Sequence, residues 1–468
     1  MKHLRGMKKL TIYWSRRDFR LHDNPALTQA ISHAKKNDSY FLPLYIVEPY
    51  MKKGIAYAQR LFLVKAIPEF FSHFQTSAVC AGKVTQIFSG LAKKYSLEIF
   101  VNEDIHPDFY SQIKKLQGGG VSITVLPDQM TISRDTKTGA GKIYSVFTPF
   151  KNTVWNEFIS APVLPTAPLG GVKYCEEKIP HTISLESLTS VFGKDMTFTV
   201  GKHEYALECA PDISEWYTNE SSALKHFDAY VKKNLLGYKD NRDQLSVDGT
   251  SKMSLALAWG LVSARMLVAR VRAHHDLRSE GVSHYISELI WREFYKYLFF
   301  HNPKLLNTEF QERFRGTIEW VPTALAHKRF GAWIKGETGY PVVDAAMKQI
   351  AKSGWMHNRA RMIVASVLTK NLGVDWRWGQ AYFQAVLLDL DEASNNGGWQ
   401  WAASVGADPK PIRIFNPYLQ AKNYDSDGAY QKKWLAADYV PVPLIEHSVA
   451  RKEALVRYTM VGKVRNYK

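Results

Sequence analysis

Four side chains of mixed chemistry share one face of a predicted helix. In ISELIWREFYKYLFFHNP, Glu288, Trp291, Arg292 and Tyr295 stand at i, i+3, i+4 and i+7, a spacing that stacks side chains on one helical face. A face turned to the core would exclude Glu and Arg unless they were paired. The pattern therefore predicts a helix that lines a cavity, with an exposed stripe carrying an i, i+4 Glu–Arg pair as the alternative.

A second helix offers three more groups to one side. In GWMHNRARMIVASVL, Asn358, Arg361 and Met362 share a face, while Arg359 points elsewhere. An amide, a guanidinium and a thioether would thus reach one cavity. His357 has no second His or Cys at ligand spacing, so we expect an ordinary hydrogen-bonded histidine and no metal site.

Carboxylates are clustered in LLDLDEASNNGGWQWAAS. Asp389, Asp391 and Glu392 could together hold Mg²⁺, as in a nuclease. With Arg361 available, a buried carboxylate is as easily explained by a fork-on-fork ion pair that orders a binding site. The residues alone leave both interpretations open.

Two glycines and two tryptophans end the same segment. Gly397 and Gly398 let the backbone approach a ligand closely, and Trp399 and Trp401 could wall a flat aromatic guest. For any single tryptophan, core filling is the alternative. Most of the 13 tryptophans fall in the C-terminal part of the chain: Trp259, Trp291, Trp320, Trp333, Trp355, Trp376, Trp378, Trp399, Trp401 and Trp434.

Three hydroxyl side chains precede or begin a predicted amphipathic helix. Thr250, Ser251 and Ser254 lie in DNRDQLSVDGTSKMSLALAWGLVSARML. Hydroxyls and free amides at a helix N-terminus form a phosphate site. A plain helix cap explains these residues equally well.

The first third of the chain alternates strands and helices. The strand candidates are TIYW, YFLPLYIV, LEIFV and VSITVL, and between them ALTQAISHAKK, AQRLFLVKAIPEFFSHF and VTQIFSGLAKKY carry apolar residues at helical spacing. This alternation predicts a doubly wound parallel sheet. No Gly-x-Gly-x-x-Gly follows the first strand, so a standard dinucleotide fingerprint is absent.

The rest of the chain has a different character. From about 151 to 215 prolines and glycines crowd together, which predicts a long linker. From about 222 onward long helical periodicities dominate, so we expect a second, nearly all-α domain. A chain of 468 residues is also too long for one ordinary core.

Charge and composition limit the partners and the compartment. The net charge of +17 favours a polyanionic partner such as nucleic acid. Three scattered cysteines argue against a disulfide framework or a zinc site. No apolar run approaches membrane-spanning length, so we expect a cytoplasmic protein without a membrane partner.

Taken in order, several motifs resemble those of the photolyase and cryptochrome family, most closely the class I cyclobutane pyrimidine dimer photolyases of microbes. They are SRRDFRLHDNPAL, YSVFTPF, GETGYPVVDAAMKQI, GWMHNRARM, NNGGWQWAAS and RIFNP. The resemblance implies a Rossmann-like α/β antenna domain at 8–131, an interdomain linker at 132–215 and a helical FAD-binding catalytic domain at 216–468. It implies light-dependent repair of UV-damaged DNA by a monomer, in the bacterial cytosol.

The resemblance also assigns residues to the flavin. Arg361 and Asp389 would form the buried pair suggested above, Asn395 would face flavin N5 in the reduced form that repair requires, and Lys252 stands where an arginine is usual. The positions that match the family's FAD contacts are Tyr238, Thr250, Ser251, Ser254, Arg292, Arg361, Asp389, Asp391 and Asn395.

Other positions match groups that act on DNA or carry electrons. The flipped-out dimer would meet the side chains of Glu288, Trp291, Asn358, Met362 and Trp401. Trp399, Trp376 and Trp320 match the tryptophan chain that carries electrons to the flavin. Phosphates around the lesion would be held by Arg242, Arg359 and Arg413.

The second chromophore and the rival functions complete the expectations. Asn102 and Glu103, at the end of a strand, lie near where folate-binding members place polar contacts, so we expect methenyltetrahydrofolate rather than a deazaflavin. A cryptochrome, a blue-light signalling receptor, is the main alternative. A photolyase for the other pyrimidine photoproduct usually has histidines where this chain has Asn358 and Met362, and a basic helical module that binds nucleic acid without chemistry is a third alternative.

Overall fold

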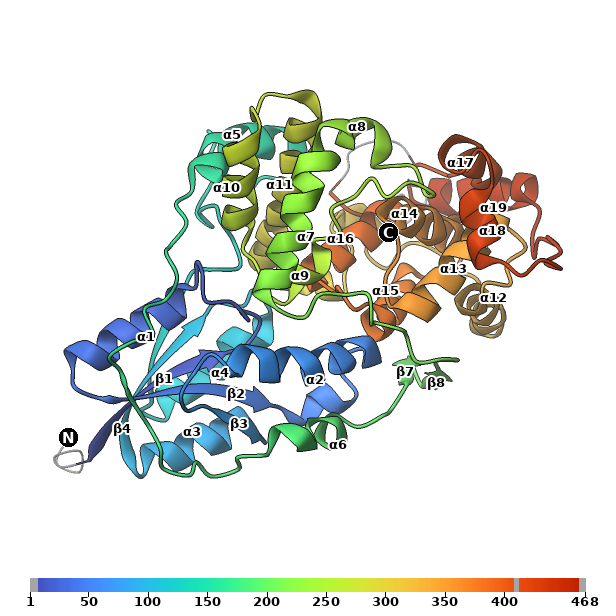
Figure 1. The fold of residues 1–468 in the computed structure, drawn as a ribbon. Helices are drawn as coiled ribbons and strands as arrows, with labels where there is room; N and C mark the ends of the chain where they lie inside the picture. The colour runs from blue at the N-terminus through green and yellow to red at the C-terminus, as the bar shows by residue number, and fades with distance from the viewer. Residues whose placement is uncertain (1–6, 408–411, 463–468) are drawn as a thin grey trace.

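The architecture has an α/β part and a helical part, side by side (Figure 1). The computed structural model describes residues 7–407 and 412–462. In Figure 1 the sheet lies at the lower left, and the helices that follow residue 220 lie above it and to its right. The predicted combination of a doubly wound parallel sheet with an all-α region is confirmed.

The main sheet is parallel, in the order β3-β2-β1-β4-β5. A two-residue strand, β6, joins it beside β2. The sheet strands are β1 (Lys8–Ser15), β2 (Tyr40–Val47), β3 (Ala78–Ala81), β4 (Tyr95–Asn102), β5 (Ser122–Leu126) and β6 (Lys173–Tyr174). The helices between them are α1 (Pro25–Lys36), α2 (Tyr57–Phe71), α3 (Val84–Ala92) and α4 (Pro107–Gly118).

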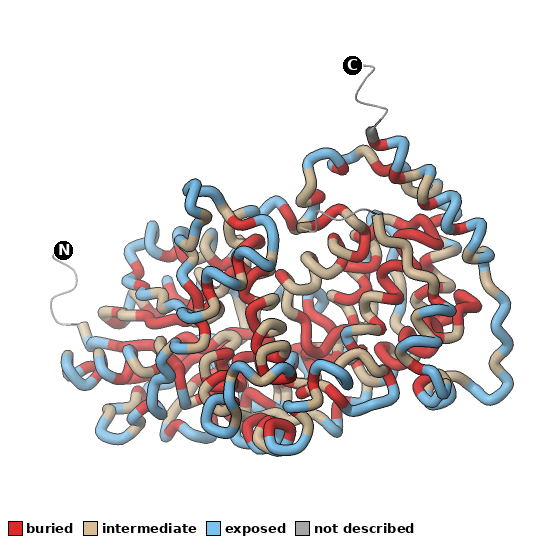
Figure 2. The backbone as a smooth tube through the Cα atoms, turned by 90° about the horizontal axis from the view of Figure 1, so that it is seen from above, coloured by how far each residue is buried: buried red, intermediate tan, exposed pale blue. Residues whose placement is uncertain are grey.

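The pleat of the strands divides the apolar residues between two cores. Leu10, Ile12 and Trp14 of β1 pack with α3 and α4 on one face, whereas Tyr13 packs with α1 and α2 on the other. The core on the α1–α2 side continues into the helical part, where buried residues run through the centre (Figure 2). Helices thus cover both faces, as a doubly wound fold requires.

The segment after the sheet is more ordered than its composition predicted. It contains α5 (Phe147–Ser160), α6 (Leu188–Phe192) and an antiparallel hairpin of β7 (Thr197–Val200) and β8 (His203–Ala206). These elements were missed because each is short or adjoins a run of prolines and glycines. β3 and α4 were also not predicted from the sequence.

The helical part begins at Glu220. Its helices are α7 (Glu220–Lys233), α8 (Tyr238–Asn241), α9 (Ser254–Ala258), α10 (Ala264–His274), α11 (Glu280–His301), α12 (Thr323–Lys335), α13 (Pro341–Ser353), α14 (Asn358–Ser366), α15 (Trp376–Val386), α16 (Glu392–Ala402), α17 (Pro417–Tyr424), α18 (Ala429–Trp434) and α19 (His447–Thr459). A π-helical turn (Val367–Asn371) continues α14. None of the helices in the described ranges is long and apolar enough to cross a membrane.

One predicted helix is broken in two. The segment from Ser254 was expected to continue through the apolar run, but α9 ends at Ala258 and α10 begins at Ala264. Between them Gly260 has φ +64°, and a Cβ there would lie 2.0 Å from the carbonyl oxygen of Arg17. The glycine therefore ends the helix and lets the N-terminal motif pack against it.

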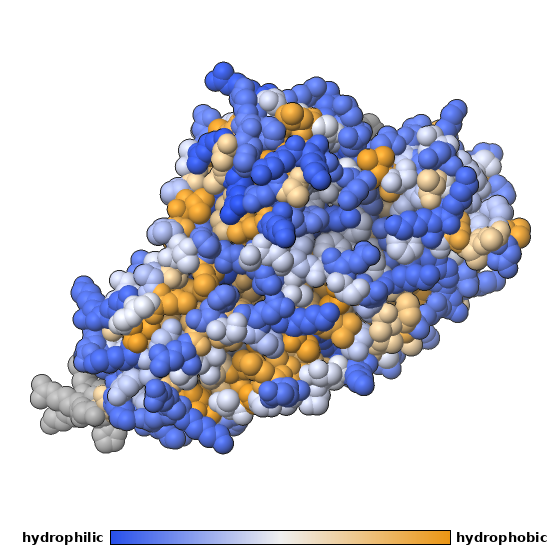
Figure 3. All heavy atoms as spheres, viewed as in Figure 1, coloured by the Kyte–Doolittle hydropathy of each residue, from blue (hydrophilic) through white to orange (hydrophobic). Residues whose placement is uncertain are grey.

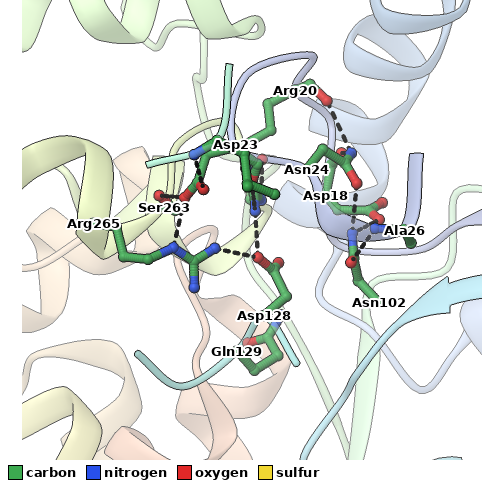
Figure 4. A network of polar contacts seen from close by, with 12 residues as sticks. Asp18, Arg20, Asp23, Asn24, Ala26, Asn102, Asp128, Gln129, Ser263 and Arg265 are labelled. Atoms are coloured by element: carbon green, nitrogen blue, oxygen red, sulfur yellow. Dashed lines mark hydrogen bonds and ion pairs between the residues drawn. The ribbon is translucent and has the colours of Figure 1, made fainter. Parts of the chain in front are cut away.

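That motif, SRRDFRLHDNPAL, joins the two parts through buried charges (Figure 4). Arg265 of α10 donates to Asp23 at 2.7 Å and to Asp128 at 3.0 Å, and Asp128 also accepts from Arg20. Ser263 donates to Asp23 as well. Because cations and carboxylates come from both parts, the network fixes how the sheet meets the helices.

Over the face seen in Figure 3, hydrophobic residues gather mainly on the α/β part.

Candidate active site

A cavity of about 480 Å³ lies inside the helical part, within the usual size of ligand sites. Side chains reach it from α8, α9, α11, α14, α15 and α16. The predicted residues that line it are Tyr238, Arg242, Ser251, Ser254, Glu288, Trp291, Arg292, Asn358, Arg361, Met362, Asp389, Asp391, Asn395, Trp399 and Trp401. The structure thus gathers residues that are up to 163 positions apart in the chain.

Five residues predicted for the flavin, the electron chain or DNA lie outside this lining, as do the two antenna residues. The five are Thr250, Trp320, Arg359, Trp376 and Arg413, and the two are Asn102 and Glu103. Arg359 turns away, as the helical spacing predicted, and binds Asp243 at 2.6 Å. Its guanidinium also lies over the ring of Tyr424, 4.3 Å from the centroid. Arg413 lies over Trp401 at 5.1 Å, beside the cavity.

The mixed face of α11 lines the cavity, as predicted, but its charges pair differently. Glu288 accepts a hydrogen bond from Arg242 rather than from Arg292. Trp291 stacks on Phe147 of α5, with ring centroids 3.6 Å apart and planes 9° from parallel. Phe147 therefore holds the indole from behind and leaves its other side towards the cavity.

The predicted pair of Arg361 and Asp389 is present, but its geometry is not fork-on-fork. One terminal nitrogen of Arg361 reaches both carboxylate oxygens of Asp389, at 2.8 and 3.0 Å. Its Nε is already used by the carbonyl of Met356, at 2.9 Å. The Asp389 side chain is 1% exposed. On the same helix, Nδ2 of Asn358 contacts Sδ of Met362 at 3.8 Å.

Asp391 holds two cations and begins α16. Its carboxylate lies 3.0 Å from Nζ of Lys296 and 3.9 Å from Nε of Arg292, and it accepts from the backbone N–H of Ser394 at 2.9 Å. Burial raises the pKa of Asp391, but the two cations and the cap bond outweigh burial and bring the pKa well below its usual value. This carboxylate is therefore charged and orients the cations at the cavity wall.

The structure favours ion pairs over a magnesium site for the clustered carboxylates, because each of them already has a cationic or basic partner. Glu392 meets His106 of the α/β part at 3.3 Å, while Asp389 and Asp391 are paired as described. Over residues 7–407 and 412–462, no group of three or more His, Cys, Asp or Glu side chains could hold a metal ion.

The two glycines of α16 have separate tasks. A Cβ on Gly397 would lie 2.1 Å from Cδ1 of Tyr295, so this glycine lets α16 approach α11. Gly398 lines the cavity, and a Cβ there would meet no atom within 4 Å. The sequence suggested that both glycines let the backbone approach a ligand, but only Gly398 borders the space that a ligand could occupy.

Two buried polar atoms of residues lining the cavity have no partner within the described part of the chain. They are Oδ1 of Asn395 and Nε1 of Trp399. An unpaired buried acceptor and donor cost stability unless a ligand satisfies them. A planar heteroaromatic group with both N–H and carbonyl functions, such as the ring system of a flavin, has the kind of donor and acceptor that these two atoms lack.

The three tryptophans of the expected electron chain lie on neighbouring segments. A Cβ on Gly379, one turn after Trp376, would lie 2.0 Å from the Trp399 ring. Val321, next to Trp320, donates from its backbone to Gly373 at 3.0 Å, just before α15. Trp399 lines the cavity and Trp320 is partly exposed. An electron path through all three stays a prediction.

His357 is the N-cap of α14. Its Nδ1 accepts from the backbone N–H of Arg359 at 3.1 Å, whereas its Nε2 is buried without a partner in the described residues. The residue is 4% exposed. Burial lowers the pKa of His357 to about 4, from an ordinary value of 6.5.

His357 is expected to make the protein's stability depend on pH. Because the unfolded chain binds a proton below about pH 6.5 and the native state only below about 4, native stability falls between these values as pH is lowered, by about 3 kcal/mol in all. Above pH 6.5 the contribution is complete. Urea unfolding at several pH values measures it, with His357→Asn as the control that keeps an N-cap acceptor. Parallel curves for the two proteins would contradict the assignment.

The two residues expected to contact the antenna pigment, Asn102 and Glu103, form hydrogen bonds within the protein. Nδ2 of Asn102 donates to Asp18 at 2.7 Å and to Asn24 at 2.8 Å, and its Oδ1 accepts from Ala26 at 3.0 Å (Figure 4). Glu103 accepts from Arg134 and from Tyr110. Both residues are under 5% exposed.

Sequence reasoning missed two residues that shape the site. Phe147 was noted only as part of YSVFTPF, and nothing local indicates that it backs Trp291. Lys296 follows Arg292 by one turn on α11, so the i, i+4 spacing placed it near the same face. This spacing was the signal that could have found it.

Both regions of the chain match models of one protein family. The family model described as DNA photolyase matches residues 11–168, and that of the FAD binding domain of DNA photolyase matches residues 285–439. A deoxyribodipyrimidine photo-lyase of Vibrio cholerae is 31% identical, over 91% of this chain and 90% of its own. The crystal structure of a class III photolyase from Agrobacterium tumefaciens has a TM-score of 0.83 and 28% identity over 98% of both chains.

A parallel sheet with helices on both faces packs on a helical part that holds a polar, aromatic cavity, and most of this helical part matches the FAD-binding family model. The chain belongs to the DNA photolyase family. A Synechocystis cryptochrome shares the fold, with a TM-score of 0.82 and 23% identity over 98% of this chain and 100% of its own. The expected closeness to class I stays a prediction.

Proposed function

We propose that this protein is a deoxyribodipyrimidine photolyase, which splits cyclobutane pyrimidine dimers in DNA under light. The observation that carries the proposal is that one cavity is lined both by side chains suited to bind a flavin and by side chains suited to bind DNA bases. Asn395 and Trp399 line it, with Oδ1 and Nε1 buried and without a partner in the described residues, beside the aromatic and polar groups of Trp291, Glu288 and Asn358.

FAD would be held by charges and by the unpaired amide. Arg361, fixed by Asp389, and Arg292, fixed by Asp391, would offer guanidinium groups to the cofactor. Oδ1 of Asn395 would accept from a protonated N5, as in the reduced ring. The chemistry that a bound, reduced flavin supplies is the donation of one electron on excitation by light.

The chain's own residues would select and hold the lesion. A dimer in duplex DNA is hidden, so it must be flipped out into the cavity. Trp291, backed by Phe147, offers a rigid flat surface for stacking, and Trp401 a second one. Glu288 and Asn358 can bond base edges, and the apolar part of the lining excludes water.

Cations near the cavity would hold the DNA backbone. Arg242 lines the cavity, Arg413 lies over Trp401, and Arg359 is on the other side of α14. The net charge of +17 favours the encounter with DNA and makes binding dependent on salt. We also propose, from the resemblance, that the protein acts as a monomer in the bacterial cytosol.

Lesion recognition is testable in the dark. We expect the protein to bind UV-irradiated oligothymidine in preference to intact oligothymidine. Trp291→Ala should lose most of this preference, because stacking on one base contributes about 1–3 kcal/mol. Trp434→Ala, on α18 and outside the cavity lining, is the control. Equal affinity of the wild type for both oligonucleotides would contradict the proposal.

For the second chromophore we propose methenyltetrahydrofolate rather than a deazaflavin, on the resemblance alone. A pigment that used Asn102 or Glu103 would have to replace contacts that these side chains now make. Mass spectrometry of the chromophores released on denaturation distinguishes a folate from a deazaflavin.

A further inference from the structure

A second cavity, of about 310 Å³, lies where the α/β part meets the helical part. Its walls come from α2, from the segment that follows β8, and from α12, α13 and α15. Figure 1 shows α15 above α2 and the β7–β8 hairpin. Among the described residues, none lines both this cavity and the flavin cavity, and neither Asn102 nor Glu103 reaches it. It is therefore a separate space.

Helix α15 divides the two cavities. Phe383 lines the flavin cavity, whereas Tyr382 and Ala385 line the second one. The Tyr382 ring packs against Trp333 with centroids 5.4 Å apart, and Trp333 meets Trp399 of the flavin cavity at 6.0 Å. Because packed rings hold this wall from behind, the second cavity keeps its shape on the α15 side.

The lining of the second cavity is mainly apolar and carries no net charge. Apolar side chains come from every wall, among them Leu207, Ile334 and Val386. The charged residues of the lining are Glu208 and Lys335, which are exposed and of opposite sign. An apolar cavity of about 150 Å³ holds benzene, so this larger space suits a compound of two fused rings.

One hydroxyl inside this cavity lacks a partner. Tyr382 is 3% exposed, and its Oη makes no hydrogen bond within the described part of the chain. Burial raises the pKa of Tyr382, and Cys209 and Glu208 raise it further. Since both of these residues also line the cavity, the hydroxyl lies on the cavity side. A buried hydroxyl without a partner costs stability unless a bound molecule satisfies it.

We propose that this cavity binds an uncharged aromatic compound of two fused rings that carries a hydrogen-bonding group for Oη of Tyr382. The apolar walls bury the rings, and the hydroxyl fixes their orientation. A neutral compound is favoured because the charges of Glu208 and Lys335 offset each other at the rim. The proposal goes beyond the repair function and does not rest on the flavin site.

Cys209 provides a reporter beside the cavity. It belongs to the lining, and its Sγ donates to the carbonyl of Ala351 at 3.4 Å. Cys209 is exposed, whereas Cys80 and Cys175 are buried, so a thiol reagent reaches Cys209 first. A compound bound in the cavity should slow this reaction.

The test compares the binding of naphthol and naphthalene to the protein saturated with FAD, so that the flavin cavity is filled. Equilibrium dialysis should show tighter binding of naphthol, by about two- to tenfold, which is the contribution of one hydrogen bond. Tyr382→Phe should bind both compounds with the affinity that the wild type has for naphthalene. Tyr418→Phe, on α17 and outside the lining, is the control that loses an exposed hydroxyl.

A pair of alanines on α15 tests the position of the bound compound. Ala385→Leu fills part of the cavity and should weaken the binding of both compounds, whereas Ala381→Leu, one turn earlier and outside the lining, should not. Naphthol should also slow the reaction of Cys209 with Ellman's reagent. Should Ala385→Leu fail to fold, Tyr382→Phe and the Cys209 rate still decide the result.

Three outcomes overturn the proposal. They are equal affinity of the wild type for naphthol and naphthalene, a preference for naphthol that survives Tyr382→Phe, and a Cys209 rate that naphthol leaves unchanged. Tighter binding of naphthoate than of naphthol would show that the ligand is an anion and overturn the assignment of a neutral one. A protein that holds no flavin would contradict the proposed function, while the effect of Tyr382→Phe would still test this site.

Discussion

Arg361→Ala is expected to yield protein that loses its flavin on purification. The change leaves Asp389, 1% exposed, without its ion partner inside the cavity. The change also removes a guanidinium that would bond the cofactor, and a charged hydrogen bond contributes about 1.5–3 kcal/mol, which corresponds to about a tenfold to hundredfold loss in affinity. Flavin absorbance relative to protein absorbance measures the loss, and titration with FAD gives the affinity.

Two variants sharpen this result. Arg361→Lys keeps the charge but cannot bond Met356 and Asp389 together, so it should retain part of the flavin. Arg359→Ala, two residues away on the outer side of α14, should retain all of it. Full flavin content in Arg361→Ala would show that the pair does not order the site.

Gly397→Ala and Gly398→Ala are expected to have opposite effects on stability. The new methyl at 397 would lie 2.1 Å from the Tyr295 ring, which is itself packed against Trp291 at 5.5 Å. Such overpacking costs about 1–3 kcal/mol or more, so α16 must shift from α11. At 398 the methyl meets nothing, and alanine is a better helix former by about 0.5–1 kcal/mol.

Thermal unfolding and flavin content check the two glycine variants together. Gly397→Ala should melt at lower temperature and hold less flavin. Without cofactor, Gly398→Ala should melt at a slightly higher temperature than the wild type, but it should bind flavin more weakly, because its methyl enters the cavity. Similar melting temperatures for both variants would contradict the packing described for α16.

Local patterns predicted the faces of the site helices. The spacing of Glu288, Trp291 and Arg292 required only helical geometry, and all three line the cavity on α11. The same holds for Asn358 and Met362 on α14. Side chains three and four residues apart share a face in any α-helix, so these predictions did not depend on tertiary structure.

Partners across elements could not be predicted in the same way. Glu288 pairs with Arg242 and not with Arg292, and Asp391 pairs with Lys296, because the packing of separate helices decides these contacts. The fork-on-fork geometry failed for a similar reason, since the Met356 carbonyl occupies Nε of Arg361.

The fold was predicted where elements are long and regular. The four longer strands and the three named helices of the α/β part are present, whereas β3, with four residues, was missed. The helix expected from Ser254 onward is broken at Gly260 because the backbone of Arg17 approaches there. That contact joins residues far apart in the chain, so no local pattern reveals it.

The central claim is light-driven repair, and one measurement tests it most directly. Flavin-loaded, reduced protein is mixed with UV-irradiated oligothymidine and exposed to near-ultraviolet or blue light, beside a dark control. Recovery of thymine absorbance in the light and none in the dark is the predicted result. Dimers that stay intact in the light, with flavin and reduction confirmed, would contradict the repair function and favour a signalling role.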